Sequence, residues 1–345
     1  MLESDRVPPK RLNLALQGGG SHGAFTWGVL DALLEDGQWS LEGISGTSAG
    51  AMNAVALAHG FAQAAREHTD PQDARLAGAE LARAALRRLW DGVGALGNMA
   101  WGLPQPQGFA GLPMMATPWL APAQINPFGI NPLRSLLVRE VDFELLAAQR
   151  NGVPAVFVCA TNVRTGRGEI FSGPRLSADA VMASACLPLL FSAVQIGGER
   201  YWDGGYSGNP ALYPLIYQTD CSDILLVQIN PIEHLGVPDT MPEIMDRMNE
   251  ITFNASLLAE LRAIEFVRRL LAEGKLDPRR YKNVRMHRID GGTPLQGQGF
   301  ASKVRADAAF LHKLFDLGRE AGQQWLLAHR ADVGVRATLD LAQHA

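Results

Sequence analysis

The sequence predicts an α/β fold with a mostly parallel central sheet flanked by helices. Apolar segments of strand length alternate along the chain with segments whose apolar residues recur at helical spacing. Two of the early strands also run into glycine-containing turns that open into helices, which is where open α/β sheets place their functional sites. With 345 residues, the chain is long enough to bury a large core.

Local patterns justify the elements in order. Residues 11–17 (RLNLALQ) alternate before a glycine run, and residues 24–36 (AFTWGVLDALLED) carry apolar side chains at helical spacing. The other expected strands are 41–47, 154–163, 168–172, 194–202, with a turn at Gly197-Gly198, and 223–230. The other expected helices are 49–60, 73–90, 142–150, 177–186, with Ser177 as N-cap, 241–273 and 303–327.

The most informative turn is Gly46-Thr47-Ser48-Ala49-Gly50, which joins the strand at 41–47 to the helix at 49–60. It fits the nucleophile-elbow pattern G-x-S-x-G, in which small neighbours permit a strained corner that pushes the serine oxygen clear of the backbone. The following helix directs its N-terminal N–H groups toward the same place. The pattern is short enough to arise by chance, so its structural context has to support it.

A second turn, Gly18-Gly19-Gly20-Ser21-His22-Gly23, follows the first strand. Consecutive glycines let backbone N–H groups converge on a negative oxygen, which favours an oxyanion hole. A tight turn and a nucleotide-binding loop are the alternatives. The G-x-G-x-x-G spacing is present and Glu42 could be the acidic residue that follows it, but the Walker lysine is absent.

A third turn, Asp203-Gly204-Gly205, follows the hairpin-like segment 194–202. Alone it would be an ordinary turn. A serine nucleophile, however, needs a base, and a carboxylate on a glycine-cleared turn can approach the serine without obstruction.

At these three turns the chain resembles the patatin-like phospholipases, in particular bacterial patatin-like serine hydrolases. Two further segments fit the resemblance, Ala183-Ser184 with Pro188 nearby, and Asn209-Pro210. Motif order and spacing agree over residues 11–230, which we expect to form the catalytic core, with 231–345 as a mainly helical C-terminal extension packed on it. One departure is His22, where many members of the family have arginine.

The resemblance implies a lipid acyl hydrolase of the phospholipase, lysophospholipase or carboxylesterase type that works with a Ser–Asp dyad and no histidine. Ser48 would attack the ester after Asp203 takes its proton, and water would then hydrolyse the acyl-enzyme. The expected oxyanion donors are the N–H groups of Gly18, Gly19, Gly20 and Ala49, with Gly46, Gly50, Gly204 and Gly205 supporting the turns. No metal or organic cofactor is expected.

Composition agrees with an intracellular enzyme. The formal net charge of −4 argues against a nucleic-acid binder. The N-terminus, MLESDRVPPK, lacks an apolar signal core, which predicts a cytoplasmic location. The three cysteines, Cys159, Cys186 and Cys221, have no paired or metal-like spacing and are expected to be buried free thiols.

Residues 92–133 contain no Asp, Glu, Lys or Arg but several prolines and aromatic residues. Such a segment could be a lid over an acyl-chain site or a peripheral membrane contact. Its Met114, Met115 and Trp119 are candidate substrate contacts, and so is His22 of the glycine loop. The alternative is an irregular segment packed on the core. The basic residues between 262 and 288 favour a solvated helix face and loop, with anionic lipid headgroups as the alternative.

Rival functions remain open. A Ser-His-Asp α/β-hydrolase would use His234 or His287, although the motif order argues against it. A catalytically silent lipid-binding protein of the same fold is a second rival, and an acyltransferase a third. The sequence leaves the natural ester and the oligomeric state undetermined.

Overall fold

The computed structural model describes residues 8–102, 131–148, 151–233, 236–295 and 302–344. The strands in this part of the chain are β1 (Lys10–Leu16), β2 (Trp39–Gly46), β3 (Ala155–Asn162), β4 (Gly168–Phe171), β5 (Val194–Ile196), β6 (Glu199–Asp203), β7 (Asp223–Gln228) and β8 (Arg285–Asp290). They form one sheet in the order β5-β6-β3-β2-β1-β7-β8, with β4 paired to β3 beside this path.

The strands from β3 to β8 in this order, β3-β2-β1-β7-β8, are mutually parallel. The β3–β4, β3–β6 and β5–β6 pairs are antiparallel. The predicted α/β class with a mostly parallel central sheet is therefore confirmed.

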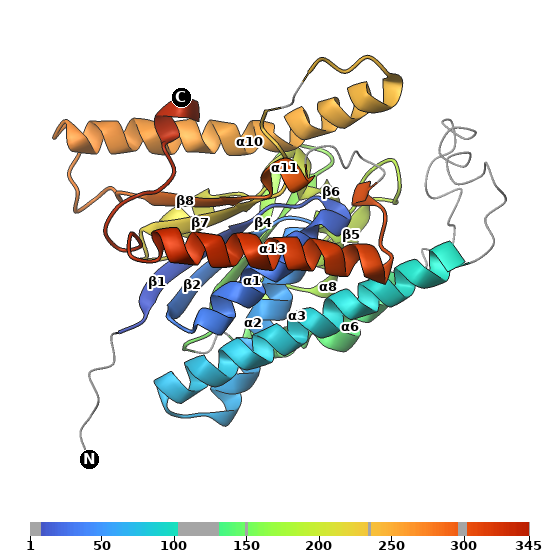
Figure 1. The fold of residues 1–345 in the computed structure, drawn as a ribbon, viewed down its shortest axis with the longest axis horizontal. Helices are drawn as coiled ribbons and strands as arrows, with labels where there is room; N and C mark the ends of the chain where they lie inside the picture. The colour runs from blue at the N-terminus through green and yellow to red at the C-terminus, as the bar shows by residue number, and fades with distance from the viewer. Residues whose placement is uncertain (1–7, 103–130, 149–150, 234–235, 296–301, 345) are drawn as a thin grey trace.

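Helices cover both faces of this sheet (Figure 1). They are α1 (Gly23–Asp36), α2 (Ala49–Glu67), α3 (Pro71–Gly102), α6 (Pro132–Glu140), α7 (Phe143–Ala147), α8 (Ala178–Ser184), α9 (Tyr213–Tyr217), α10 (Met241–Ala272), α11 (Gly292–Leu295) and α13 (Ala308–His329). Short 3₁₀ turns complete the description: η1 (Gly20–His22), η2 (Gly173–Arg175), η3 (Gly204–Tyr206) and η4 (Leu341–His344). In Figure 1, α13 and α1 lie in front of the sheet and α10 runs above it.

The alternation of side chains along the central strands creates two cores. Leu12, Leu14 and Leu16 of β1 point into a large cluster with α1, α2, α3 and α13, whereas Ala15 faces a second cluster that contains Leu257 and Leu261 of α10. Successive strand side chains point to opposite faces, so both faces of β1 are buried. This explains why the sequence of the central strands is apolar with few interruptions.

Several local signals in the sequence act as expected. The Ser177 side chain accepts the N–H of Ala180 and so caps α8. Gly197 and Gly198 join β5 to β6 with positive φ angles, which is the hairpin turn predicted there.

The uncharged segment differs from the expectation at its beginning. Residues 92–102 continue α3, which was expected to end near residue 90. Residues 103–130, including Met114, Met115 and Trp119, lie outside the described residues, so the lid and the membrane contact stay predictions. Among the described residues, we find no helix with the length and apolar character required to cross a bilayer.

Helices α6, α9 and α11 and strand β8 were not predicted from the sequence. Helix α6 begins at Pro132 after Asn131, whose side chain caps it; this Asn-Pro signal was available in the sequence. Strand β8 was not predicted because its arginines belong to the basic segment at 262–288, which was interpreted as a solvated helix face and loop. It extends the central sheet beside β7, so the region after residue 230 contributes a strand as well as helices. The boundary at residue 230 stays a prediction.

Candidate active site

Ser48 occupies a strained corner between β2 and α2. Its backbone angles are φ 54° and ψ −120°, and within the described part of the chain it is the only non-glycine residue with a positive φ. Residues other than glycine rarely adopt this backbone conformation, and it persists only where the surrounding structure enforces it. The strain itself is what the G-x-S-x-G pattern predicted.

Neighbouring contacts enforce this corner. The Gly50 N–H donates to the Thr47 carbonyl at 2.8 Å, and the Ser48 N–H donates to Ser184 Oγ at 2.9 Å. A methyl group on Gly46 would lie 2.5 Å from the Gly50 carbonyl oxygen, so the two elbow glycines are needed for close packing.

Asp203 is the last residue of β6, and the structure brings it to Ser48. Its carboxylate accepts a hydrogen bond from the Ser48 hydroxyl, and its Oδ1 accepts the Gly205 N–H at 2.7 Å. Its own N–H donates to the Cys186 carbonyl at 2.8 Å. Gly204 allows the turn to approach, since a methyl group there would lie 2.1 Å from the Cys159 carbonyl oxygen.

Burial controls the charge of Asp203. The side chain is 1% exposed. Burial raises the pKa of Asp203 to about 7, although the hydrogen bonds from the Gly205 N–H and the Ser48 hydroxyl oppose this rise. A carboxyl group with a pKa near neutrality can both accept and return a proton at physiological pH, which is the requirement for a general base and acid.

The glycine loop lies beside the corner, but its first N–H is already used. The Gly18 N–H donates to Asn209 Oδ1 at 2.7 Å, so Gly18 positions the loop and cannot serve as the predicted oxyanion donor without breaking this bond. Its closeness to the elbow requires glycine, because a methyl group would lie 2.7 Å from the Cβ of Ser48.

Three predicted donors remain. Within the described part of the chain, the structure records no hydrogen bond from the N–H groups of Gly19, Gly20 or Ala49. Ala49 is the first residue of α2, where an N–H group has no partner inside the helix. No recorded protein acceptor therefore competes for these N–H groups, and their role as oxyanion donors stays a prediction.

His22, at the position where many members of the family have arginine, is buried beside the glycine loop. It is 2% exposed, and its Nε2 lies 2.7 Å from Ser302 Oγ. Burial, and to a lesser extent the nearby Lys303 ammonium, lowers the pKa of His22 to about 3. The imidazole is therefore neutral at physiological pH and has a packing role.

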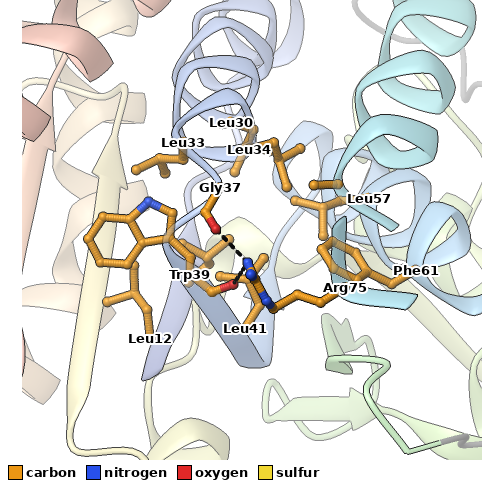
Figure 2. Close-up of a pocket in the computed structure, with 12 residues that line it drawn as sticks. Leu12, Leu30, Leu33, Leu34, Gly37, Trp39, Leu41, Leu57, Phe61 and Arg75 are labelled. Atoms are coloured by element: carbon orange, nitrogen blue, oxygen red, sulfur yellow. Dashed lines mark hydrogen bonds between the residues drawn. The ribbon is translucent and has the colours of Figure 1, made fainter. Parts of the chain in front are cut away.

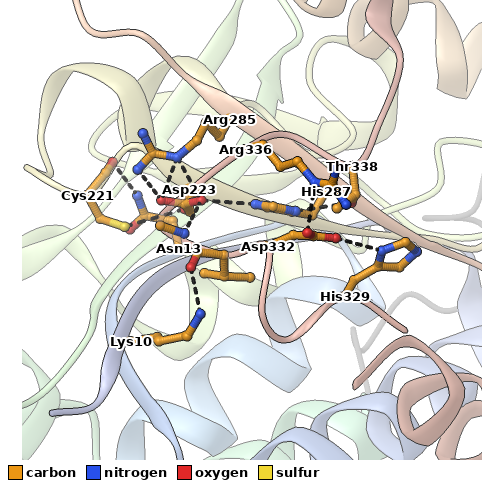
Figure 3. Close-up of polar contacts among 12 residues, drawn as sticks. Lys10, Asn13, Cys221, Asp223, Arg285, His287, His329, Asp332, Arg336 and Thr338 are labelled. Carbon is orange, nitrogen blue, oxygen red and sulfur yellow. Dashed lines mark hydrogen bonds and ion pairs between the residues drawn. The ribbon is translucent and has the colours of Figure 1, made fainter. Parts of the chain in front are cut away.

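His287 lies on β8, at the opposite edge of the sheet from β5, and both of its ring nitrogens have hydrogen-bond partners there. Its Nε2 lies 3.0 Å from Asp223 Oδ1 and its Nδ1 lies 3.1 Å from Thr338 Oγ1 (Figure 3). Arg285 pairs with the same aspartate. The side chain of His287 is fully buried in this polar cluster, so the structure does not support His287 as the histidine of a triad. His234 lies outside the described residues.

The small apolar cavity in Figure 2 is remote from Ser48. It lies at the other end of the strands, where Trp39 begins β2, and includes neither Ser48 nor Asp203. Its free volume of about 10 Å³ holds about one water molecule. Arg75 closes it by donating to the carbonyls of Gly37 and Trp39. This cavity is a packing defect and not a substrate site.

The described residues contain no group of three or more His, Cys, Asp or Glu side chains placed to hold a metal ion. The three cysteines are buried and unpaired. Burial raises the pKa of the Cys159 thiol to about 12 and that of Cys186 to about 11, so neither is a reactive thiolate.

The sequence profile of the patatin-like phospholipase family matches residues 14–216, more than half of the chain. The chain belongs to this family. The match includes Ser48, Asp203 and the glycine loop, and membership in the patatin-like phospholipases indicates lipid acyl hydrolase activity.

Other comparisons are distant. The crystal structure of VipD from Legionella pneumophila matches with 16% sequence identity and a TM-score of 0.34, over 90% of this chain and 67% of VipD. A search of curated protein sequences gave no significant match.

Two site residues were missed in the sequence. Asn230 Nδ2 donates to the Gly18 carbonyl at 2.6 Å, and Lys303 Nζ donates to Asn230 Oδ1 at 3.0 Å. More than 200 residues separate either one from the glycine loop, and neither belongs to a local motif. Only the folded structure reveals them.

Proposed function

We propose that this protein hydrolyses acyl esters of lipids, with Ser48 as nucleophile and Asp203 as general base. The observation that carries the proposal is the hydrogen bond from the Ser48 hydroxyl to the buried Asp203 carboxylate, made at a strained strand-to-helix corner. A dyad of this kind provides an activated hydroxyl without a histidine.

In the first half of the reaction, Asp203 takes the hydroxyl proton while Ser48 Oγ bonds to the ester carbonyl carbon. The tetrahedral intermediate then collapses: the bond to the alcohol oxygen breaks, and the proton on Asp203 passes to the departing alcohol. In the second half, Asp203 takes a proton from water, whose oxygen attacks the acyl-enzyme. The proton returns to Ser48 as the fatty acid leaves.

The N–H groups of Gly19, Gly20 and Ala49 are the proposed donors to the oxyanion. They have no recorded partner among the described residues, and the N-terminal end of α2 adds a positive partial charge beside Ser48. Loss of one such donor typically costs about 3 kcal/mol in the barrier.

Apolar side chains near the dyad favour an acyl substrate. Tyr206, three residues past Asp203, is 38% exposed and packs edge to face on Phe253 at 5.3 Å. Leu189 and Phe191 follow Cys186, whose carbonyl holds the Asp203 N–H, and are 73% and 46% exposed. The uncharged segment with Met114, Met115 and Trp119 is a further candidate acyl contact on composition alone.

The test uses simple esters, defined phospholipids and a fluorophosphonate that labels activated serines. Ser48→Ala should abolish both labelling and hydrolysis. Asp203→Asn should lower hydrolysis at least about a hundredfold, since general-base catalysis typically supplies that much. The double variant should be no worse than Ser48→Ala, because each member of the dyad is idle without the other.

Ser207→Ala is the matched control. Ser207 lies in the same turn as Asp203, but its hydroxyl pairs with Thr161 Oγ1 at 2.7 Å, so this variant should keep most of the activity. Hydrolysis that survives in folded Ser48→Ala would refute the proposed nucleophile. An Asp203→Asn variant with more than about a tenth of the wild-type rate would refute the proposed base.

A further inference from the structure

Ser302 and Lys303 lie against the glycine loop although they are distant from it in the sequence. Ser302 Oγ is 2.7 Å from His22 Nε2. A methyl group on Gly20 would lie 2.2 Å from the Lys303 carbonyl oxygen, so these two backbones are in direct contact. Gly20 also has a positive φ of 58°, which favours glycine at this contact.

A chain of hydrogen bonds runs from the Lys303 ammonium into the loop. Lys303 Nζ donates to Asn230 Oδ1 at 3.0 Å, and Asn230 Nδ2 donates to the Gly18 carbonyl at 2.6 Å. The amide orientation of Asn230 follows from its partners, because an ammonium can only donate and a carbonyl can only accept. Asn230 is fully buried.

This series of hydrogen bonds ends at a peptide group of the proposed oxyanion site. The Gly18 carbonyl and the Gly19 N–H belong to the same peptide unit, so a hydrogen bond received at the carbonyl oxygen polarises the N–H at the other end. Hydrogen bonds arranged in series strengthen one another in this way, the more so in a buried site. A charged donor at the start makes the first bond stronger than a neutral one would.

We propose that Lys303 is a positioning residue of the oxyanion site, acting through Asn230 and the Gly18–Gly19 peptide to strengthen the Gly19 N–H as a donor. This inference rests on the proposed function, since it assumes that an oxyanion forms beside Ser48. It assigns to the C-terminal region a part in the chemistry of a site whose other members, apart from Asn230, lie before residue 210.

The charges around Lys303 decide how its effect should depend on pH. The ammonium is faced by Glu250 and Asp246 of α10 and by the neutral His22 of η1. Burial lowers the pKa of Lys303 below its usual value, although the two carboxylates oppose the shift. Deprotonation of Lys303 at alkaline pH would remove the charge from the first donor of the relay, the series of hydrogen bonds from Lys303 through Asn230 to the Gly18 carbonyl. The rate constant kcat should therefore fall at alkaline pH in the wild type.

The test is Lys303→Met, which keeps most of the length of the side chain and removes its charge. Rates on a short-chain p-nitrophenyl ester are divided by the concentration of Ser48 that a fluorophosphonate can label, so that a folding defect does not count as a catalytic one. We expect kcat to fall about tenfold with KM nearly unchanged, less than the loss of an entire oxyanion donor. We also expect the alkaline fall in kcat to disappear.

Lys282→Met is the matched control. Lys282 is also partly buried, and its ammonium donates to the main-chain carbonyls of Leu215 and Thr219, which belong to no part of the relay. This variant should keep the wild-type kcat and its alkaline fall.

Either of two results would overturn the role of Lys303: a Lys303→Met kcat within about twofold of the wild type, or a reduced kcat that keeps the alkaline fall. In both cases an inactive Ser48→Ala variant would leave the proposed function standing. Hydrolysis by Ser48→Ala would instead remove the premise of both proposals.

Discussion

Ser184 Oγ accepts the backbone N–H of Ser48 at 2.9 Å. The bond ties the strained corner after β2 to the last residue of α8. It also engages the N–H of the proposed nucleophile, so that the N–H of the next residue, Ala49, is the one proposed as an oxyanion donor. The corner is therefore held from two sides, by the first turn of α2 and by a segment 136 residues further along the chain.

The strain at Ser48 should be measurable as stability. Glycine accommodates a φ of 54° without the penalty of about 1–3 kcal/mol that other residues incur. Ser48→Gly should therefore have a higher melting temperature than Ser48→Ala, even though glycine loses about 0.5–1 kcal/mol of extra chain entropy on folding. Both variants should be inactive. Thermal unfolding of the pair tests this, and equal melting temperatures would contradict a strained corner.

The buried Asp203 should set the acid limb of the activity. A base must be ionised to act, and burial raises the pKa of Asp203 to about 7. The ratio kcat/KM should therefore rise with pH up to about 7 and level off above it. His22 cannot produce this limb, because its pKa is lowered to about 3. A profile that is flat between pH 5 and 8 would contradict Asp203 as the base.

The same carboxyl group should destabilise the fold at alkaline pH. Its pKa is raised from an ordinary value near 3.9 to about 7 in the folded protein. The associated stability is present below the unfolded pKa and is lost as the pH rises through the folded pKa. Asp203→Asn should therefore melt at a higher temperature than the wild type at pH 8, and this advantage should shrink at pH 5. Glu260, whose pKa burial also raises to about 7, is present in both proteins and cancels in the comparison.

The loop position of His22 should tolerate a neutral side chain better than a charged one. Arginine would place a cation in a site that is 2% exposed and near the Lys303 ammonium, at a cost of about 3 kcal/mol or more. His22→Arg should therefore lose stability and activity together, whereas His22→Gln should remain folded and within several-fold of the wild-type rate. Chemical denaturation and ester hydrolysis measure the two effects. An active, fully stable His22→Arg variant would show that the site can admit a charge.

His287 should matter for stability and not for chemistry. Although burial acts against it, the hydrogen bonds from His287 and Arg285 hold the pKa of Asp223 well below its usual value. His287→Gln should weaken this buried cluster by about 1–3 kcal/mol while leaving turnover per labelled Ser48 nearly unchanged. A triad histidine would instead cost several orders of magnitude in turnover, so a folded but inactive His287→Gln variant would revive the histidine-dependent hydrolase.

How much of the site the sequence predicts depends on how local each part is. The elbow at Ser48, the hairpin before Asp203 and the cap at Ser177 are governed by residues that are close along the chain. Glycine spacing and hydrogen-bonding side chains restrict the backbone there whatever the distant surroundings. The mostly parallel sheet was predicted from another local signal, the alternation along the chain of apolar strand segments with segments of helical spacing. A local pattern says nothing about burial, so the charge of His22 could not be decided from the sequence. Strand β8 was missed because it carries Arg285, whose charge pairs in the fold with Asp223 of β7.

By itself, then, the sequence determined the fold class, the family resemblance and the two turns that present Ser48 and Asp203. Only the tertiary structure decided which groups surround them. It engages the N–H of Gly18 with Asn209, keeps His22 neutral and carries Lys303 to the glycine loop. Desolvation and hydrogen bonding act between atoms that are close in space. Residues separated by hundreds of positions can therefore set the charge of a site that a few neighbouring residues shape.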